Sequence, residues 1–452
     1  MASTYLAKTN PTAGSRQKGT ISFWVKRGKL GSSEFLYVEE LNSTDNGVVL
    51  FSSGNTFNFI NYNGGSATAQ LSTNRLFRDT SAWYHLMVAW DTTQATSSDR
   101  IKMYINGEQE TSFSTAIYPS LNDNLKFGIG SPSGNNYDIN IGRRAAGDYF
   151  TGSMSHFHRV DDQQLDVSVF GEYDANGVWK IKTSPSITYT GSSSFNFFIL
   201  KDGNSVTDQS GNGNNLTVAG GTLTNTEDNP SNVFATMNVL TLSASQVNIN
   251  KGNLSKTNTP TSNAWRSFYG TLGASSGKYY WEFKVDLIES SDPNNIMVGI
   301  VDAEQMVNTA NNNYSSTESR GYQYHAQTGN KINNGSQSSY GATYTAGDII
   351  GIAVDLDNHK LYFHKNGTYQ NSGDPTSGAT GTGSAFDIAT GYTYLPAFSQ
   401  YYGNEHFSVN FGNGYFGTTA VASAGTNASG IGIFEYDVPT GYTALSTTGL
   451  NL

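Results

Sequence analysis

The chain has 452 residues with a formal net charge of -10, and 13% of its residues are aromatic while only 14% are charged. The acidic balance and the scattered Lys and Arg residues argue against nucleic acid or an anionic membrane as a partner, and the absence of cysteine excludes disulfides, thiolate zinc sites and cysteine nucleophiles. With 49 Gly, 27 Tyr and 24 Phe, the composition favours an all-β protein of short strands and tight turns, and the length favours two domains.

The start of the chain, residues 1–5, lacks a basic segment followed by an apolar stretch. No apolar run in the sequence reaches the ~18 residues that a membrane helix needs. We therefore expect a protein that is made in a cytoplasm and does not insert into a membrane.

The first strands follow from the apolar pattern. Residues 20–26 (TISFWVK) alternate apolar and polar side chains, and residues 83–91 (WYHLMVAWD) form a more continuous apolar run that suits a central strand. Residues 101–105 then place Ile101, Met103 and Ile105 on one face. Asn106 and Gly107 follow, and this pair predicts a type I′ hairpin turn.

The second half of the sequence repeats this device. An apolar run at 347–355 (GDIIGIAVD) is followed by residues 360–365 (KLYFHK) and then by Asn366 and Gly367. Both halves thus contain a buried strand that ends in Asp and an Asn-Gly hairpin. The pattern predicts two antiparallel β-sandwiches in tandem.

Between them, residues 166–242 are rich in Ser, Asn and Gly, so we expect the domain boundary there. Trp179, Phe195, Phe197 and Phe198 are anchors that an unstructured linker would not need, and we predict that part of this segment packs on a sandwich. Aromatic residues in the tail, 421–452, predict that it docks onto a domain.

Several segments of the first half, in this order, resemble the concanavalin A-like lectin/glucanase superfamily in its laminin-G-like form. The segments are 20–26, 78–85, 104–107, 141–142 and 149–154. The second half resembles a SPRY domain, through residues 277–283, 298–300, 347–355, 361–363, 366–367, 395–398 and 407–412. The resulting prediction is a laminin-G-like sandwich at 1–165, a connecting segment at 166–242, a SPRY-like sandwich at 243–420 and a docking tail at 421–452.

This pairing of domains, with the link DQSGNGNN at 208–215 and the ending VPTGY at 438–442, resembles structural proteins of marine tailed bacteriophages. The resemblance implies a virion protein, tail-fibre-like or an appendage component. Its expected partners are other virion proteins and a host-surface glycan, and it is expected to form a homo-oligomer, with a trimer as one arrangement.

Catalytic motifs are missing from the sequence. Glycoside hydrolases of the superfamily carry paired acids in the pattern Glu-x-Asp-x-x-Glu, and Glu435 with Asp437 is only a fragment of it. His156 and His158 form a close pair that could belong to a zinc site, but two packing histidines explain them better. We expect a non-enzymatic protein.

Laminin-G-like domains often bind Ca²⁺ at one rim, so the resemblance implies a possible structural Ca²⁺ site. Oxygen ligands for it are available in Asp91, Asp99 and Asp123. Asp91 also suits a turn residue that accepts a hydrogen bond from its own backbone, and we favour that interpretation.

Aromatic residues fall into two groups. Trp24, Trp83, Trp90 and Trp281 sit inside apolar strands and are expected in the cores. Five tyrosines flanked by Ser, Gly and Asn are the candidate ligand contacts, although they could instead pack the loops themselves: Tyr314, Tyr322, Tyr324, Tyr340 and Tyr344.

The function that these features favour is binding, either to a host-surface glycan or between virion subunits. A decoration or connector protein of the capsid is the structural alternative. A glycan hydrolase is a third possibility that rests on superfamily membership alone.

Overall fold

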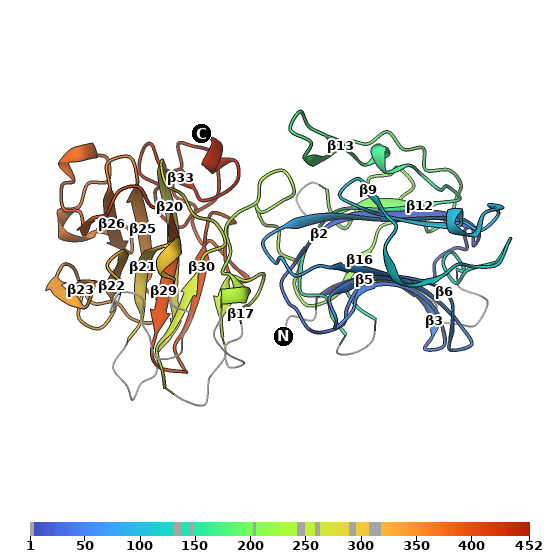
Figure 1. Cartoon of the computed structure of the whole chain (residues 1–452), viewed down its shortest axis with the longest axis horizontal. Coiled ribbons are helices and arrows are strands. Elements are labelled where there is room, and N and C mark those ends of the chain that lie inside the picture. Colours follow the sequence, from blue (N-terminus) through green and yellow to red (C-terminus); the bar gives the residue numbers. More distant parts are fainter. Residues whose placement is uncertain are drawn as a thin grey trace. The chain divides into compact units, whose positions relative to one another are not determined.

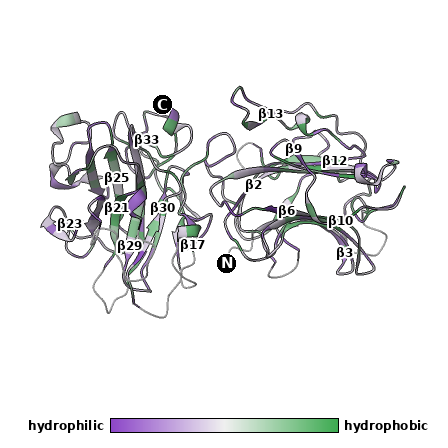
Figure 2. Cartoon of the chain, viewed as in Figure 1, coloured by the Kyte–Doolittle hydropathy of each residue, from purple (hydrophilic) through white to green (hydrophobic). Residues whose placement is uncertain are grey.

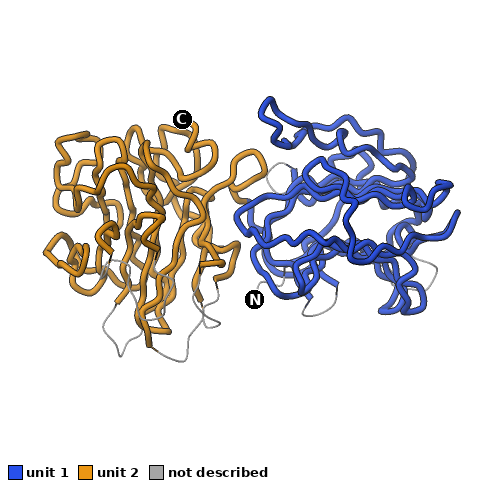
Figure 3. Tube along the Cα trace, in the orientation of Figure 1, with its two compact units in different colours: residues 1–225 blue, residues 226–452 orange. Residues whose placement is uncertain are grey.

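The computed structural model describes residues 4–130, 138–144, 148–201, 205–241, 249–257, 263–288, 295–306 and 318–452. The chain divides into two compact units, Met1–Asn225 and Thr226–Leu452 (Figure 3). The division falls inside the segment 166–242. In the described residues all helical turns are short 3-10 turns, and the regular structure is otherwise β (Figure 1).

Unit 1 is a sandwich of two antiparallel sheets. The eight-stranded sheet has the order β10-β6-β5-β4-β3-β11-β1-β16, and the six-stranded sheet has the order β15-β12-β2-β7-β8-β9. The first contains β1 (Tyr5–Thr9), β3 (Glu34–Asn42), β4 (Asp45–Phe51), β5 (Thr56–Asn63), β6 (Ser66–Leu76), β10 (Phe113–Ile117), β11 (Asp138–Ile141) and β16 (Thr217–Gly220). The second contains β2 (Lys18–Arg27), β7 (Trp83–Asp91), β8 (Ile101–Ile105), β9 (Glu108–Glu110), β12 (Gly152–Asp161) and β15 (Phe197–Ile199). A separate hairpin joins β13 (Gly171–Tyr173) to β14 (Trp179–Ile181), and the 3-10 turns are η1 (Ser97–Asp99) and η2 (Val167–Val169).

Unit 2 is a second sandwich. Its larger sheet has the order β17-β18-β30-β20-β25-β26-β27, with β28 beside β26 and β33 beside β20, and its smaller sheet has the order β19-β29-β21-β22-β23-β24. The larger sheet contains β17 (Ile249–Asn250), β18 (Ser255–Lys256), β20 (Lys278–Leu287), β25 (Ile349–Asp355), β26 (Lys360–Lys365), β27 (Thr368–Tyr369), β28 (Phe386–Asp387), β30 (His406–Asn410) and β33 (Thr443–Ala444). The smaller contains β19 (Arg266–Tyr269), β21 (Met297–Asp302), β22 (Gly321–His325), β23 (Asn330–Asn333), β24 (Ser336–Ser339) and β29 (Tyr394–Gln400). A short pair joins β31 (Tyr415–Phe416) to β32 (Thr419–Ala420), and the 3-10 turns are η3 (Val239–Thr241), η4 (Ala303–Gln305), η5 (Gln370–Ser372), η6 (Gly378–Thr380) and η7 (Gly449–Asn451).

Each core forms between the two sheets of its unit, because alternate residues of a strand point to the same face. Ile21, Phe23 and Val25 of β2 enter the core of unit 1, and Trp281, Phe283 and Val285 of β20 enter that of unit 2. Figure 2 shows the hydrophobic colour on strands of both units, among them β12 and β21, and the hydrophilic colour at several turns. The all-β fold predicted from the sequence is confirmed.

The expected turns are observed, and of the four tryptophans expected in the cores, Trp90 and Trp281 lie there. Asn106 and Gly107 both have positive φ, as do Asn366 and Gly367, which is what a type I′ turn requires. The side chains of Trp24, Trp83, Trp90 and Trp281 are all buried. Trp24 lies on the outer face of β2, and Trp90 and Trp281 lie inside their cores.

In each unit, the segment that follows the main strands of the sandwich packs on that sandwich. Trp179, Phe195, Phe197 and Phe198 are buried in unit 1, and the tail residues Phe434, Val438 and Tyr442 form a second apolar layer outside the larger sheet of unit 2. Tail strand β33 pairs in parallel with β20. In the described part of the chain, no helix has the length and apolar character needed to cross a bilayer.

Candidate functional sites

Four of the five candidate tyrosines lie in the core of unit 2. Tyr322 and Tyr324 are on β22, Tyr340 and Tyr344 follow β24, and all four are buried. The Tyr344 hydroxyl donates to the backbone oxygen of Tyr324 at 2.8 Å, and Tyr324 donates to the backbone oxygen of Ala342. The prediction that these four form an exposed contact surface is therefore wrong. Tyr314 lies outside the described residues.

The proposed Ca²⁺ ligands have other partners. Asp91 accepts hydrogen bonds from the backbone and hydroxyl of Thr93 at 3.0 and 2.6 Å, and it pairs with Lys18 at 3.5 Å. Asp99 pairs with Lys102 at 3.2 Å. In the part of the chain that the structure describes, no three His, Asp or Glu side chains gather as metal ligands, so Asp91, Asp99 and Asp123 form no such group.

The two histidines and the acidic fragment also have structural contacts. The rings of His156 and His158 both pack on Phe198. Glu435 accepts from the backbone N–H of Ala422, and Asp437 accepts from Thr426, so both acids hold turns of the tail.

A cleft of about 410 Å³ lies on the outer face of the eight-stranded sheet of unit 1. The residues that line it come from β1, β3, β11 and β16 and from the segment after β11: Tyr5, Ala7, Thr9, Glu40, Leu41, Asn42, Asp138, Asn140, Arg143, Arg144 and Ala219. Leu6, Ile139 and Ile141 point into the core, so their neighbours on the same strands point outward into the cleft. The register aligns Thr9, Asp138 and Glu40 in one row across three strands.

Glu40 and Asp138 are directly opposite each other on antiparallel strands, and neither carboxylate has a hydrogen bond or ion pair within 4.0 Å to a described residue. Burial raises the pKa of both carboxyls. Part of this rise is offset by positive charges: those of Arg144 and Arg143 act on Glu40, and that of Arg143 acts on Asp138. Like charges opposite each other are unfavourable. Among the described residues, these two acceptors of the cleft therefore have no donor.

Arginines flank these acids but are held by aromatic rings. The Arg143 guanidinium lies 4.4 Å from the ring centre of Tyr5, and its buried Nε has no hydrogen-bond partner among the described residues. Arg144 lies 5.4 Å from the ring centre of Phe35 and donates to the backbone oxygen of Ser43 at 3.3 Å. Ring contacts of this kind fix a guanidinium while leaving N–H donors available.

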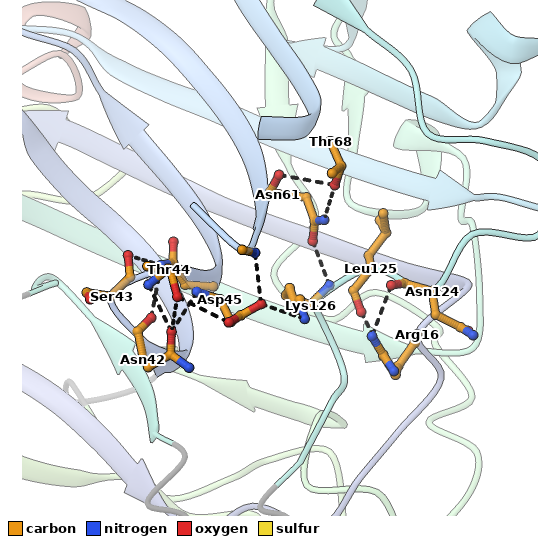
Figure 4. Close-up of polar contacts among 12 residues, drawn as sticks. Arg16, Asn42, Ser43, Thr44, Asp45, Asn61, Thr68, Asn124, Leu125 and Lys126 are labelled. Carbon is orange, nitrogen blue, oxygen red and sulfur yellow. Dashed lines mark hydrogen bonds and ion pairs between the residues drawn. The ribbon is translucent and has the colours of Figure 1, made fainter. Parts of the chain in front are cut away.

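The turn between β3 and β4 forms one rim of the cleft and is fixed by short-range contacts (Figure 4). The Asn42 side chain accepts from the backbone N–H of Thr44 and of Asp45, both at 2.9 Å. Asp45 pairs with Lys126 at 2.8 Å, and this contact lowers the pKa of Asp45 to about 2. Asn61 in turn accepts from the backbone N–H of Lys126 at 2.6 Å. The rim is therefore ordered before any ligand binds, which lowers the entropic cost of binding.

The two halves of the chain match known domain families. Residues 2–163 match the concanavalin A-like lectin/glucanases superfamily, and residues 278–414 match the SPRY domain. The chain carries a concanavalin A-like lectin domain followed by a SPRY domain. The lectin match lies inside unit 1 and the SPRY match inside unit 2.

Curated relatives share only a short stretch with the chain. Ran-binding protein 9 of Danio rerio is 33% identical over 97 residues, and Ran-binding protein 10 of Danio rerio is 34% identical over 97 residues. Each match covers 21% of this chain and 15% of the relative, so the chain spans a small part of these proteins.

Solved structures that the chain matches include the SPRY domain of human HERC1, at 21% identity and a TM-score of 0.30, covering 37% of this chain and 93% of that one. The heptameric SAP-like pentraxin from Limulus polyphemus has 15% identity and a TM-score of 0.27, covering 36% of this chain and 72% of that one.

The SPRY domain has a second candidate surface at the loop between β29 and β30. Tyr401 and Tyr402 are half-buried there, and Trp265 packs edge-on against Tyr401 with ring centres 5.4 Å apart. The buried Glu405 carboxylate accepts from the backbone N–H of Tyr401 at 3.2 Å and of Tyr402 at 3.0 Å. Burial raises the pKa of Glu405 to about 7.

Lys256 holds the same loop through hydrogen bonds to its backbone. Its ammonium donates to the backbone oxygens of Gly403 and Glu405 at 2.6 and 2.7 Å, and burial lowers its pKa to about 7. Partly exposed rings on a braced loop supply rigid contact area at low entropic cost.

Sequence reasoning missed the residues of both surfaces. Glu40 and Asp138 are 98 positions apart, and only the strand register brings them together. For the SPRY loop a signal was present: two adjacent tyrosines stand between the strand segments 395–398 and 407–412.

Proposed function

We propose that the chain is a non-enzymatic binding protein whose lectin domain holds a sugar in the cleft on its eight-stranded sheet. The observation that carries this proposal is the pair of carboxylates, Glu40 and Asp138, that lack a partner in the described part of the chain. Sugar hydroxyls donate to carboxylates and accept from guanidinium N–H groups, and the cleft offers both.

The finer proposal places the protein on a tailed bacteriophage particle, as a tail-fibre-like or appendage component. Its support is the resemblance of the domain order, the 208–215 link and the 438–442 ending to such proteins. In this role the cleft engages a host-surface glycan, the SPRY loop contacts another virion subunit, and a homo-oligomer strengthens weak single contacts through multivalency.

A glycan array with the full chain tests the cleft. We expect binding to a defined set of glycans, with a loss of at least tenfold in affinity in Glu40→Gln and in Asp138→Asn. Glu304→Gln is the matched control, because the Glu304 side chain is 82% exposed in the other unit. Binding that survives both cleft variants would overturn the assignment of the cleft.

The virion placement needs a separate measurement. Quantification of the protein in purified particles distinguishes an adhesin, present in few copies at the tail, from a capsid decoration protein, present over the whole shell. Absence from purified particles would contradict the phage proposal while leaving the cleft untouched.

Glycoside hydrolysis is a second candidate that one observation favours. Two carboxyls with pKa values raised by burial stand opposite each other in a cleft, and paired acids of this kind perform glycosidic cleavage. Release of reducing ends from β-glucans that disappears in Glu40→Gln would establish hydrolysis. We expect no release, and binding without turnover.

A further inference from the structure

The β13–β14 hairpin of the lectin domain lies outside the six-stranded sheet, on the side away from the eight-stranded sheet (Figure 1). In the part of the chain that the structure describes, its strands pair only with each other. Among the described residues, two side chains of residues 171–181 form hydrogen bonds to the sheet or its turns. Trp179 donates to His85, and Tyr173 donates to the backbone oxygen of Asn106. The hairpin is thus attached by side chains and not by a backbone ladder.

The contact to His85 fixes the protonation of the imidazole. The Trp179 indole Nε1–H is only a donor, and it lies 3.1 Å from Nδ1 of His85, so Nδ1 carries no proton. The proton of the neutral ring is therefore on Nε2, which lies 2.8 Å from the Ser22 hydroxyl. A second proton can enter only at Nδ1, where it would face the indole N–H.

His158 occupies the same layer. It is paired with Ser22 in the β12–β2 register, its ring stacks on Phe198 with centres 3.9 Å apart, and Phe170, which precedes the hairpin, packs on it at 5.2 Å. Its Nδ1 is 2.7 Å from the hydroxyl of Tyr189, in the segment that follows the hairpin. Both histidines are buried, so the covering segment rests on two uncharged imidazoles.

We propose that the segment 170–189, which contains the β13–β14 hairpin, is a flap that acid releases, because protonation of His85 and His158 breaks the contacts that hold it on the sheet: Trp179 on His85, and Phe170 and Tyr189 on His158. Release uncovers an aromatic surface that includes Trp24, which packs against His85 with ring centres 5.2 Å apart and is 5% exposed in the closed form. Exposed aromatic surface of this kind is typical of interaction sites.

The sign follows from proton linkage. Burial lowers the pKa of His85 to about 3, and burial followed by the charges of His156 and His85 lowers the pKa of His158. In the open form both rings regain a pKa of about 6.5, so the open form binds more protons below that pH. The ionisable side chains around the pair are His156 on β12, Tyr189, Tyr173 on β13 and, on the same sheet face, Lys26 on β2 and Lys102 and Tyr104 on β8.

Protonation changes the equilibrium constant for flap opening by a factor that depends on pH. Each histidine favours opening about tenfold for each pH unit below about 6.5. For His85, whose pKa in the closed form is about 3, this gives roughly 30-fold between pH 6.5 and pH 5, and His158 adds a further factor in the same direction.

Hydrogen exchange of the full chain, followed by mass spectrometry and corrected for the intrinsic exchange rate, measures this opening. We expect the protection of residues 171–181 to fall more than roughly 30-fold from pH 7 to pH 5, while the amides of β7 keep theirs. In His85→Asn, which retains an acceptor near the indole, the fall should be roughly 30-fold smaller than in the unaltered chain. His359→Gln in unit 2 is the control that removes a histidine elsewhere.

Two results would overturn the proposal. The first is equal corrected exchange of residues 171–181 at pH 7 and pH 5 in the unaltered chain, which needs no variant to fold. The second is loss of protection in β7 together with the hairpin, because that pattern reports unfolding of the whole sandwich.

Discussion

Glu282 on β20 is fully buried, and its carboxyl group binds the tail to the SPRY domain. Its replacement by Gln removes the ionisable group but also replaces one hydrogen-bond acceptor by a donor. It accepts from the backbone N–H of Glu435 at 2.9 Å and of Tyr436 at 2.8 Å, and from the side chains of Tyr280 and Asn410. Gly367 donates to Nδ1 of His364, so Nε2 of that ring carries the proton and points it at Tyr280, whose own hydroxyl proton is directed to Glu282.

Burial raises the pKa of Glu282 from 4.5 to about 7, because the cost of removing the charge from water exceeds what the four donors return. The folded protein then holds a proton that the unfolded chain releases between these two values, so stability falls as pH rises through this window. The loss between pH 5 and pH 8 amounts to about 2–3 kcal/mol. The Gln variant has no such loss, although its amide nitrogen must face two donors, which costs roughly 1–3 kcal/mol at every pH.

Urea unfolding from pH 5 to pH 8, followed by tryptophan fluorescence, measures the difference between the two proteins. We expect Glu282→Gln to be less stable than the unaltered chain at pH 5 and nearly equal to it at pH 8. Glu304→Gln, on the surface of the same unit, should show no such convergence. A stability difference that widens with pH would refute the reasoning, because it would mean that the four donors hold the pKa of Glu282 below its ordinary value.

Three further changes test the packing. Arg159→Met removes the cation that pairs with the buried Glu39 carboxylate at 3.1 Å, and the free energy of unfolding of unit 1 should fall by about 3–5 kcal/mol; a loss below about 1 kcal/mol would contradict the pairing. Gly351→Ala places a Cβ 1.9 Å from the His364 ring, and calorimetry should show a lower Tm for unit 2, by the equivalent of about 1–3 kcal/mol. Tyr344→Phe removes the donor to the Tyr324 carbonyl and should cost about 1 kcal/mol in urea unfolding, whereas an exposed contact tyrosine would cost nothing.

The alternating pattern of the sequence was sufficient to predict two sandwiches, because the side-chain period of a strand is two and one face must be apolar. The hairpin turns were equally local, since Asn106 with Gly107 and Asn366 with Gly367 supply the positive φ values themselves. The burial of the tyrosines could not be predicted from their neighbours in the sequence. Tyr322 and Tyr324 stand among polar residues that suggest a loop, yet both are buried on β22, between β21 and β23.

By itself, then, the sequence determined the fold class, the two hairpins and the tryptophans of the cores, all of which depend on residues close together in the chain. The tertiary structure decided which acids face each other in the cleft, which loop presents its rings, and that the hairpin over His85 is attached by side chains alone. The physical reason is that strand register joins residues such as Glu40 and Asp138 across long separations, and no local pattern specifies which strands become neighbours.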